Sequence, residues 1–177
     1  HVMGTRDEIV TFKEAPPPPE KQNFRIMVPV ANPDTALRMV SQTMTVAEKN
    51  SAHIELIHMV PVPDQIPLAD AEKYAYPGEE GIAEAMLYLS SRFPVSHTVR
   101  YCRNAARGIL TAAREHQTDL IMMGWRGRSQ RRDFLFGSTL DPILERNPCD
   151  VIILRNCSQR TYKQILVPVA GGPHSVR

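Results

Sequence analysis

Two short apolar runs, separated by glycines and a helical pattern, constrain the fold of this chain more than any other feature. The runs are residues 120–123 (LIMM) and 151–154 (VIIL), and each is short enough for one buried strand. Gly124 and Gly127 follow the first run directly, and a helical pattern covers residues 137–146. A strand, a helix and a second strand in this order predict a parallel pair of strands joined by a crossover helix.

The same alternation of strand and helix continues through most of the chain. Three more strands are predicted at residues 24–31, 54–60 and 95–102. The helices between them are predicted at residues 32–50, with Asn32 as N-cap, at residues 69–92, with a break at Pro77-Gly78, and at residues 104–116. Five strands alternating with helices predict an α/β fold, a five-stranded parallel doubly wound sheet with helices on both faces.

Size and composition favour one soluble globular domain. The chain has 177 residues, of which 42% are hydrophobic and 23% charged. The formal net charge of +2 argues against a dedicated nucleic-acid-binding protein. No apolar run approaches the roughly 18 residues of a membrane span. Three cysteines without C-x-x-C spacing indicate reduced thiols in a cytosolic setting, with Cys102 and Cys149 as small buried hydrophobic residues.

The two ends of the chain differ from its middle. Residues 1–23 have little periodicity and contain four consecutive prolines, so we expect a flexible proline-rich linker. The sequence VPVA at residues 28–31 recurs at residues 167–170, in both cases before a proline-containing turn. We therefore expect one domain at residues 24–156, and a linker with the first strand of a truncated second repeat at residues 157–177.

The glycine-rich segment after the fourth predicted strand suits phosphate binding. Glycines at a strand end let the backbone approach a ligand, because no Cβ obstructs it. Ser138 and Thr139 would add hydroxyl donors beside the free N–H groups of a helix N-terminus. The segment is neither a Walker-type P-loop nor a G-x-G-x-x-G fingerprint. No nucleophile–base pair, carboxylate pair or His/Cys cluster points to catalysis or to a metal site.

The full spacing Gly124-x2-Gly127-x9-Gly137-Ser138 resembles the nucleotide-binding signature of the universal stress protein family. The resemblance covers residues 24–155. It implies the strand order 3-2-1-4-5 of folds similar to the adenine nucleotide alpha hydrolases. In that order the switch point, where ligands bind outside the carboxyl ends of the strands, lies between the first and fourth strands.

The resemblance also implies a set of ligand-binding residues. The phosphate and ribose side would be lined by Met123, Gly124, Gly127, Gly137, Ser138 and Thr139. The backbone of Met59 or Val60 would lie near the adenine. Arg126 and Arg128 belong to a group of four loop arginines that would attract a polyphosphate, or would simply form a solvated loop.

One position departs from the family pattern. ATP-binding members usually carry an aspartate at the end of the first strand, where this chain has Ala31 followed by Asn32. Asn32 could replace the aspartate, but it is equally well explained as a helix cap. The candidate ligands are therefore ATP, AMP or a cyclic nucleotide, and absence of a ligand stays an alternative.

The repeated VPVA strand and the Gly124-Trp125-Arg126-Gly127 sequence resemble a narrower subgroup of the family. In that subgroup, tandem stress-protein domains form the cytoplasmic tail of membrane transporters of the amino-acid permease or cation–proton antiporter type. The resemblance implies a regulatory nucleotide-binding module that acts in stress response or transport regulation. The alternative is a docking module that forms a homodimer through the predicted edge strand from Val151 to Leu154. Nothing in the sequence predicts ATP hydrolysis.

Overall fold

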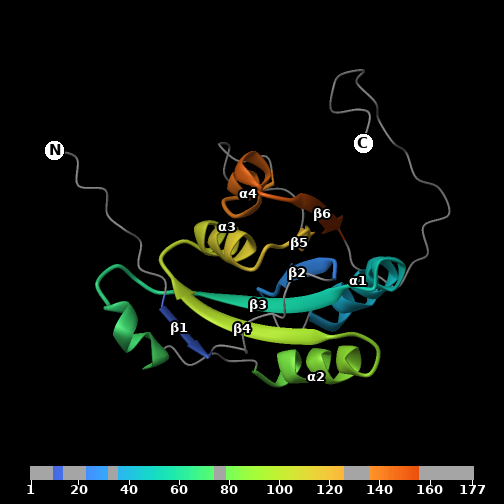
Figure 1. Ribbon diagram of the computed structural model, residues 1–177. Coiled ribbons are helices and arrows are strands. Elements are labelled where there is room, and N and C mark those ends of the chain that lie inside the picture. The colour runs from blue at the N-terminus through green and yellow to red at the C-terminus, as the bar shows by residue number, and fades with distance from the viewer. Residues whose placement is uncertain (1–9, 14–22, 32–35, 74–78, 126–135, 156–177) are drawn as a thin grey trace, which may run out of the picture.

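The computed structural model describes residues 10–13, 23–31, 36–73, 79–125 and 136–155 of the chain. Six strands form one sheet in the order β1-β4-β3-β2-β5-β6 (Figure 1). Their bounds are β1 Val10–Lys13, β2 Arg25–Pro29, β3 His53–Pro61, β4 Val95–Cys102, β5 Leu120–Trp125 and β6 Asp150–Arg155.

Five of the six strands are parallel neighbours, running from β4 through β3, β2 and β5 to β6. Numbered by their place among the five predicted strands, they lie in the order 3-2-1-4-5. The predicted fold class, strand order and doubly wound topology are therefore confirmed. β2 is the first of these strands and β5 the fourth, so the switch point lies between them, as expected.

β1 is an addition that the sequence did not reveal. It pairs antiparallel with β4, from Val10 opposite Tyr101 to Lys13 opposite Val99, with an irregular register between Thr11 and Lys13. The segment that we expected to be a linker therefore contains a short edge strand. Four residues are too few to show a reliable alternation, so the only available sequence signal was the content of β-formers.

Two layers of helices cover the sheet. α1 (Ala36–Asn50) and α2 (Glu79–Ser90) lie on one face, and α3 (Ala105–Glu115) and α4 (Leu140–Arg146) lie on the other (Figure 1). β2 shows how one strand serves both layers, since Ile26 and Val28 pack with the first pair of helices and Met27 with the second. All three side chains are fully buried, as expected for a strand covered on both faces.

Several predicted boundaries were wrong in detail. The region 69–92 contains a 3₁₀ helix, Leu68–Lys73, and then α2, and the predicted break at Pro77-Gly78 lies outside the described residues. The first parallel strand ends at Pro29, because the chain bends at Ala31 even though Val30 stays buried. The last helix begins at Leu140, since Gly137 has a φ of +131° that no helix contains.

The third predicted helix is confirmed, and the structure shows Asn104 as its N-cap. The backbone N–H of Arg107 donates to Oδ1 of Asn104 at 3.0 Å, which satisfies one of the free donors of the first turn. Across the part of the chain that is described, no helix combines the length and the apolar character that a membrane crossing needs. The repeated VPVA segment at residues 167–170 lies outside the described residues.

Candidate functional site

The carboxyl ends of the five parallel strands lie along one edge of the sheet, and β2 and β5 separate there. The ladder between them joins only Ile26 to Leu120 and Met27 to Ile121, although β2 continues to Pro29 and β5 to Trp125. β2 and β3 in contrast stay paired as far as Pro29 and Ile57. The two central strands therefore part at the switch point, where an open α/β sheet binds its ligands.

Gly124 provides bare backbone at this point. It is exposed, whereas Met123 before it is buried, with its side chain in the hydrophobic cluster beneath α3 and α4. A Cβ added at Gly124 would lie 3.1 Å from Sδ of Met39 in α1, which is closer than a normal contact. Of these two predicted site residues, Met123 thus belongs to the core through its side chain, and Gly124 leaves the edge of the sheet uncovered.

The glycine and the hydroxyl residues before α4 form a closed turn. Gly137 has a φ of +131°, which favours glycine strongly, and its carbonyl accepts from the backbone N–H of Asp141 at 3.1 Å. Oδ1 of Asp141 in turn accepts from the backbone N–H of Phe136 at 2.9 Å. Ser138 is exposed, and the side chain of Thr139 makes no capping hydrogen bond although Thr139 is the N-cap of α4.

The acidic residue at this turn limits how much the N-terminus of α4 can contribute to the binding of an anion. α4 has seven residues and carries Asp141 in its first turn. That carboxylate stabilises the helix through its interaction with the positive end of the dipole, and it also repels a second anion at the same place. A phosphate group would therefore rely on the hydroxyl groups of Ser138 and Thr139 more than on the dipole of α4.

Trp125 contacts Phe136, so the residues on either side of the arginine-containing segment lie together. Its Nε1–H donates to the Phe136 carbonyl at 3.1 Å, and the two rings meet edge to face with centroids 5.2 Å apart. The guanidinium of Arg155 lies 5.2 Å from the centre of the Trp125 ring. The tryptophan thus packs on neighbouring side chains. Three predicted site residues, Arg126, Gly127 and Arg128, lie outside the described residues.

The two predicted adenine contacts, Met59 and Val60, differ in the direction in which their backbone N–H and carbonyl groups point. β3 residues face β2 and β4 alternately, and the Ile57 carbonyl faces β2, since it accepts from the N–H of Val30 at 2.8 Å. The backbone groups of Met59 therefore face the same side, past the last pair of the β2–β3 ladder, and those of Val60 face β4. The Met59 side chain is 8% exposed and packs where α3 has Gly108, so only its backbone faces the edge.

The loop after β3 forms a rim at the carboxyl edge of the sheet and is held by one arginine. The Nη1 group of Arg103 donates to the carbonyl oxygens of Val62, at 3.2 Å, and of Pro63, and its Nη2 group donates to that of Ile66 at 2.7 Å. Val62 itself is buried in a small apolar cluster with Leu68, Ala71, Val99 and Tyr101. The rim is thus anchored by both charge-assisted hydrogen bonds and burial.

Ala31 is exposed directly after Val30, which is 4% exposed and bound to β3. The structure therefore gives this position a backbone contact at most, and no carboxylate. Asn32, which follows it, lies outside the described residues.

Sequence reasoning missed a polar cluster on the α3 face. The Glu55 carboxylate accepts from the Thr98 hydroxyl at 3.0 Å and lies 2.8 Å from Nδ1 of His116. Nε2 of His116 lies 3.0 Å from a guanidinium nitrogen of Arg100. Arg100 also pairs with Glu115 at 2.6 Å. The available signal was one charged residue inside each of two predicted strands, Glu55 and Arg100.

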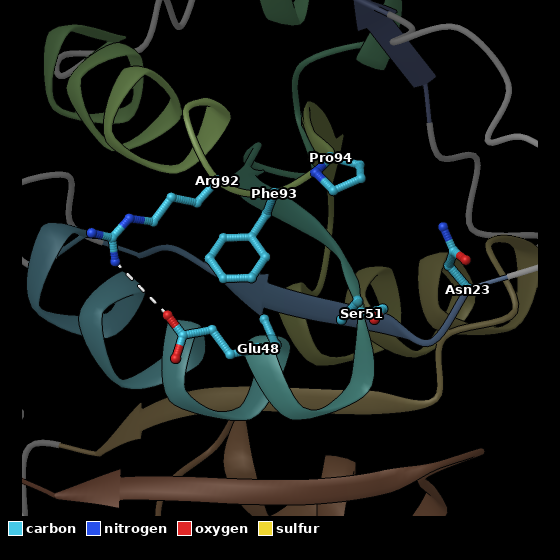
Figure 2. Close-up of a pocket in the computed structure, with 8 residues that line it drawn as sticks. Asn23, Glu48, Ser51, Arg92, Phe93 and Pro94 are labelled. Carbon is cyan, nitrogen blue, oxygen red and sulfur yellow. Dashed lines mark ion pairs between the residues drawn. The ribbon is translucent and has the colours of Figure 1, made fainter.

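A groove of about 540 Å³ lies at the opposite edge of the sheet (Figure 2). It is lined by Asn23, Ala47, Glu48, Ser51, Ala52, Arg92, Phe93 and Pro94. Arg92 and Glu48 form an ion pair of 3.8 Å across it, with both side chains more than half exposed. The groove shares no residue with the predicted site, because it adjoins the amino ends of β2 and β4.

Burial disfavours the thiolate form of both described cysteines. Burial raises the pKa of the Cys102 thiol to about 11 against a smaller opposite effect of a backbone hydrogen bond from Asn104. Burial likewise raises the pKa of the Cys149 thiol to about 11, with Asp150 and Asp119 adding to the shift. The interpretation of Cys102 as a small buried hydrophobic residue is confirmed, since it is 1% exposed in the cluster beneath α3. Cys149 is only half-buried, so the same interpretation holds for it in part.

Known structures with the same fold were found by comparison. A universal stress protein, UspA, from Lactobacillus plantarum superposes with a TM-score of 0.60 at 21% identity, over 75% of this chain and 98% of that one. A universal stress protein solved in complex with cAMP superposes with a TM-score of 0.57 at 20% identity, over 77% and 98% of the two chains. One from Archaeoglobus fulgidus, in complex with dAMP, gives a TM-score of 0.53 at 16% identity, over 73% and 96%.

A curated relative is a much longer protein. The Na(+)/H(+) antiporter NhaS5 of Synechocystis sp. is 27% identical over 166 residues, which cover 86% of this chain. This chain spans 22% of the length of that antiporter. The profile of the Universal stress protein family matches residues 23–155, which include every strand of the parallel sheet. The chain therefore belongs to the universal stress protein family.

Proposed function

We propose that this domain binds an adenine nucleotide at the carboxyl edge of the sheet, between β2 and β5, and acts as a regulatory module. The observation that carries the proposal is the separation of these two strands beside Gly124, which is exposed and has no side chain. The complexes of two family members with dAMP and with cAMP support an adenine nucleotide as the ligand class.

The ligand would lie across the strand ends. Its phosphate would contact the backbone at Gly124 and the hydroxyl groups of Ser138 and Thr139, with Gly127, Arg126 and Arg128 nearby. Its adenine would meet the backbone of Met59. Ala31 offers no carboxylate to the nucleoside, which AMP, a cyclic adenine nucleotide and ATP all contain, so all three stay candidate ligands.

The test begins with the purified protein. Heat denaturation followed by chromatography and mass spectrometry of the supernatant should release adenine nucleotide at about one molecule per chain. Calorimetric titration of the emptied protein with AMP, cAMP and ATP then ranks the ligands. No released nucleotide and no binding heat at millimolar concentration would overturn the proposal.

Gly124→Val is the variant that tests the place of the ligand. The valine side chain would fill the uncovered backbone, so AMP affinity should fall at least tenfold. Since the new Cβ also crowds Met39, Met39→Leu serves as the matched control, and it should retain the wild-type affinity. Unchanged affinity in Gly124→Val would show that the ligand binds elsewhere.

We further propose that the domain belongs to the cytoplasmic part of a membrane transporter, where nucleotide occupancy biases transport. Similarity to part of the antiporter NhaS5 supports this setting. Occupancy can act only if the ligand binds two states of the protein with different affinity. Fractionation of cells with an antibody against this domain should recover the full-length polypeptide with the membranes, and its recovery in the soluble fraction would count against the transporter.

A second candidate function is a docking module that pairs through β6. β6 is an outer strand of the described sheet, and its four central residues, from Val151 to Leu154, are only half-buried. Such an edge can pair with a second copy of itself. Light scattering at high protein concentration tests the pairing, and a monomer would contradict it.

A further inference from the structure

His58 is a buried polar residue outside the set of proposed ligand contacts. It lies on β3 with 7% of its surface exposed, directly before Met59. Its Nδ1 atom is 2.6 Å from the carbonyl oxygen of Val30, which comes one residue before Ala31. One side chain therefore joins the two strand ends that would flank the nucleoside.

The chemistry of this contact fixes the state of the imidazole ring. A carbonyl oxygen can only accept a hydrogen bond, so Nδ1 of His58 carries the proton and donates. Burial lowers the pKa of His58, and the hydrogen bond to Val30 opposes that effect only in part. At neutral pH the ring is thus the neutral tautomer with hydrogen on Nδ1.

Val30 is held by both of its backbone groups. Its N–H donates to the carbonyl of Ile57 at 2.8 Å, and its carbonyl accepts from His58 at 2.6 Å. Val30 lies past the end of β2, so the sheet ladder alone holds only one of the two groups. The side chain of His58 supplies the second bond, and with it β3 fixes the direction in which the chain leaves toward Ala31.

We propose that His58 is a positioning residue of the nucleotide site, which sets the backbone of Val30 and Ala31 against that of Met59. This inference rests on the proposed function. It follows from the residue that stands at position 31. A carboxylate there could reach a ligand from several backbone positions by rotating its side chain. Ala31 offers only its backbone, so any contact with the ligand depends on where the backbone itself is held.

The experiment compares three substitutions at position 58. His58→Leu removes the donor and keeps an apolar side chain of similar reach. His58→Asn places an amide N–H at nearly the position of Nδ1, and His58→Gln places it one carbon farther from the backbone. AMP affinity is measured by calorimetry. Amide hydrogen exchange of Val30 and Ala31 is measured in the protein without ligand, with Met122 in the centre of β5 as the internal reference.

We expect exchange at Val30 and Ala31 to accelerate at least tenfold in His58→Leu, with Met122 unchanged, and AMP affinity to fall about tenfold. His58→Asn should restore both quantities to within about threefold of the wild type, and His58→Gln should not. A residue that merely filled space would give equal results for the asparagine and glutamine variants. That equality, or unchanged exchange in a folded leucine variant, would overturn the inference.

The two proposals fail in different ways. If the wild-type protein binds no nucleotide, the proposed function fails and the site that His58 would serve is lost with it, whatever the exchange rates. If the wild type binds AMP and all three variants bind it equally well, the proposed function stands and the role of His58 is wrong. Should His58→Leu fail to fold, the comparison of His58→Asn with His58→Gln still decides.

Discussion

The two edges of the parallel sheet are held together by different chemistry. Toward the amino ends, on the α3 face, side chains bind one another: Glu55 contacts Thr98 and His116, and His116 contacts Arg100. At the carboxyl ends, between β2 and β5, the described groups are mostly backbone, with Gly124 uncovered and Val30 bound through its N–H and carbonyl.

This difference distinguishes the part of the sheet where side chains stabilise the fold from the part where we propose that the ligand binds. In the polar cluster each ring nitrogen of His116 has a partner, since Nε2 must accept from the guanidinium of Arg100 and Nδ1 then donates to Glu55. Groups that are already paired have little to offer a ligand. An edge of exposed backbone and exposed hydroxyl groups leaves room for a ligand at little cost to the fold, which is why we propose that the ligand binds there.

The largest effect is expected from breaking the polar cluster. Glu55→Ala leaves Nδ1–H of His116 and the hydroxyl of Thr98 without their acceptor in a place where both side chains are largely buried. We expect the free energy of unfolding to fall by about 3 kcal/mol, because each buried donor left without an acceptor costs about 1–3 kcal/mol. Urea denaturation measures it, and the AMP affinity of the folded fraction should not change.

Glu84→Ala is the matched control for this prediction. Glu84 is exposed on α2, so its removal should change the free energy of unfolding by no more than about 0.5 kcal/mol. If Glu55→Ala is as mild as this control, the cluster does not stabilise the fold, and the contrast between the two edges disappears.

A smaller effect is expected from the turn before α4. Gly137→Ala puts a side chain on a backbone with a φ of +131°, although nothing lies within 4 Å of the new Cβ. The cost is therefore strain alone, of about 1–3 kcal/mol, measured by urea denaturation. Wild-type stability in this variant would mean that the turn can adopt another conformation without loss.

Much of the fold followed from the sequence, because strands buried on both faces are continuous apolar runs that a reader can find. Residues 95–102 instead alternate between polar and apolar residues, and they were predicted as a strand with the bounds that β4 has. β1 could not be found, since its pairing with β4 depends on a partner about ninety residues away. The turn at Gly137 was also misjudged, because a residue pattern cannot report a positive φ.

The candidate site was only partly predictable. Spacing identified Gly124 and Gly137, and the strand order brought the end of β3 to the same edge. The role of His58 could not be predicted, since its hydrogen bond is to the backbone of a residue 28 positions away. A backbone carbonyl accepts such a bond whatever the residue type, so the sequence gives no signal for it. The Glu55–His116 contact, across 61 positions, was missed for the same reason.

A third prediction concerns pH. Burial lowers the pKa of His58, and burial likewise lowers the pKa of His53, against an opposite effect of Glu55. Both rings then bind a proton less readily in the folded than in the unfolded chain, whose reference pKa is 6.5. Their contribution to stability is therefore complete above that pH and is lost as the pH falls below it.

Urea denaturation at pH 7.5, 6.5 and 5.5 measures this loss. His58→Asn cannot take up the proton, so its free energy of unfolding should decline less over this interval than that of the wild type. Parallel declines in the two proteins would show that His58 does not resist protonation, and would contradict the neutral state assigned to its ring.

The smallest effect is expected from a single hydroxyl group at the carboxyl edge. Ser138 is exposed, and its hydroxyl has no role in the cap of α4, where Thr139 is the N-cap. Ser138→Ala should therefore leave the free energy of unfolding unchanged. If the hydroxyl binds a phosphate, AMP affinity should fall by a factor of about 5 to 10, the range of one hydrogen bond to a neutral donor.

Ser90→Ala is the matched control, because Ser90 is also exposed and its hydroxyl donates only to the Leu87 carbonyl of its own helix. It should change neither quantity. Calorimetry on both variants separates the two possible outcomes. A loss of affinity confined to Ser138→Ala would mean that the edge without paired side chains binds the ligand. Equal affinity in both variants would leave Gly124 as the contact and take the turn before α4 out of the site.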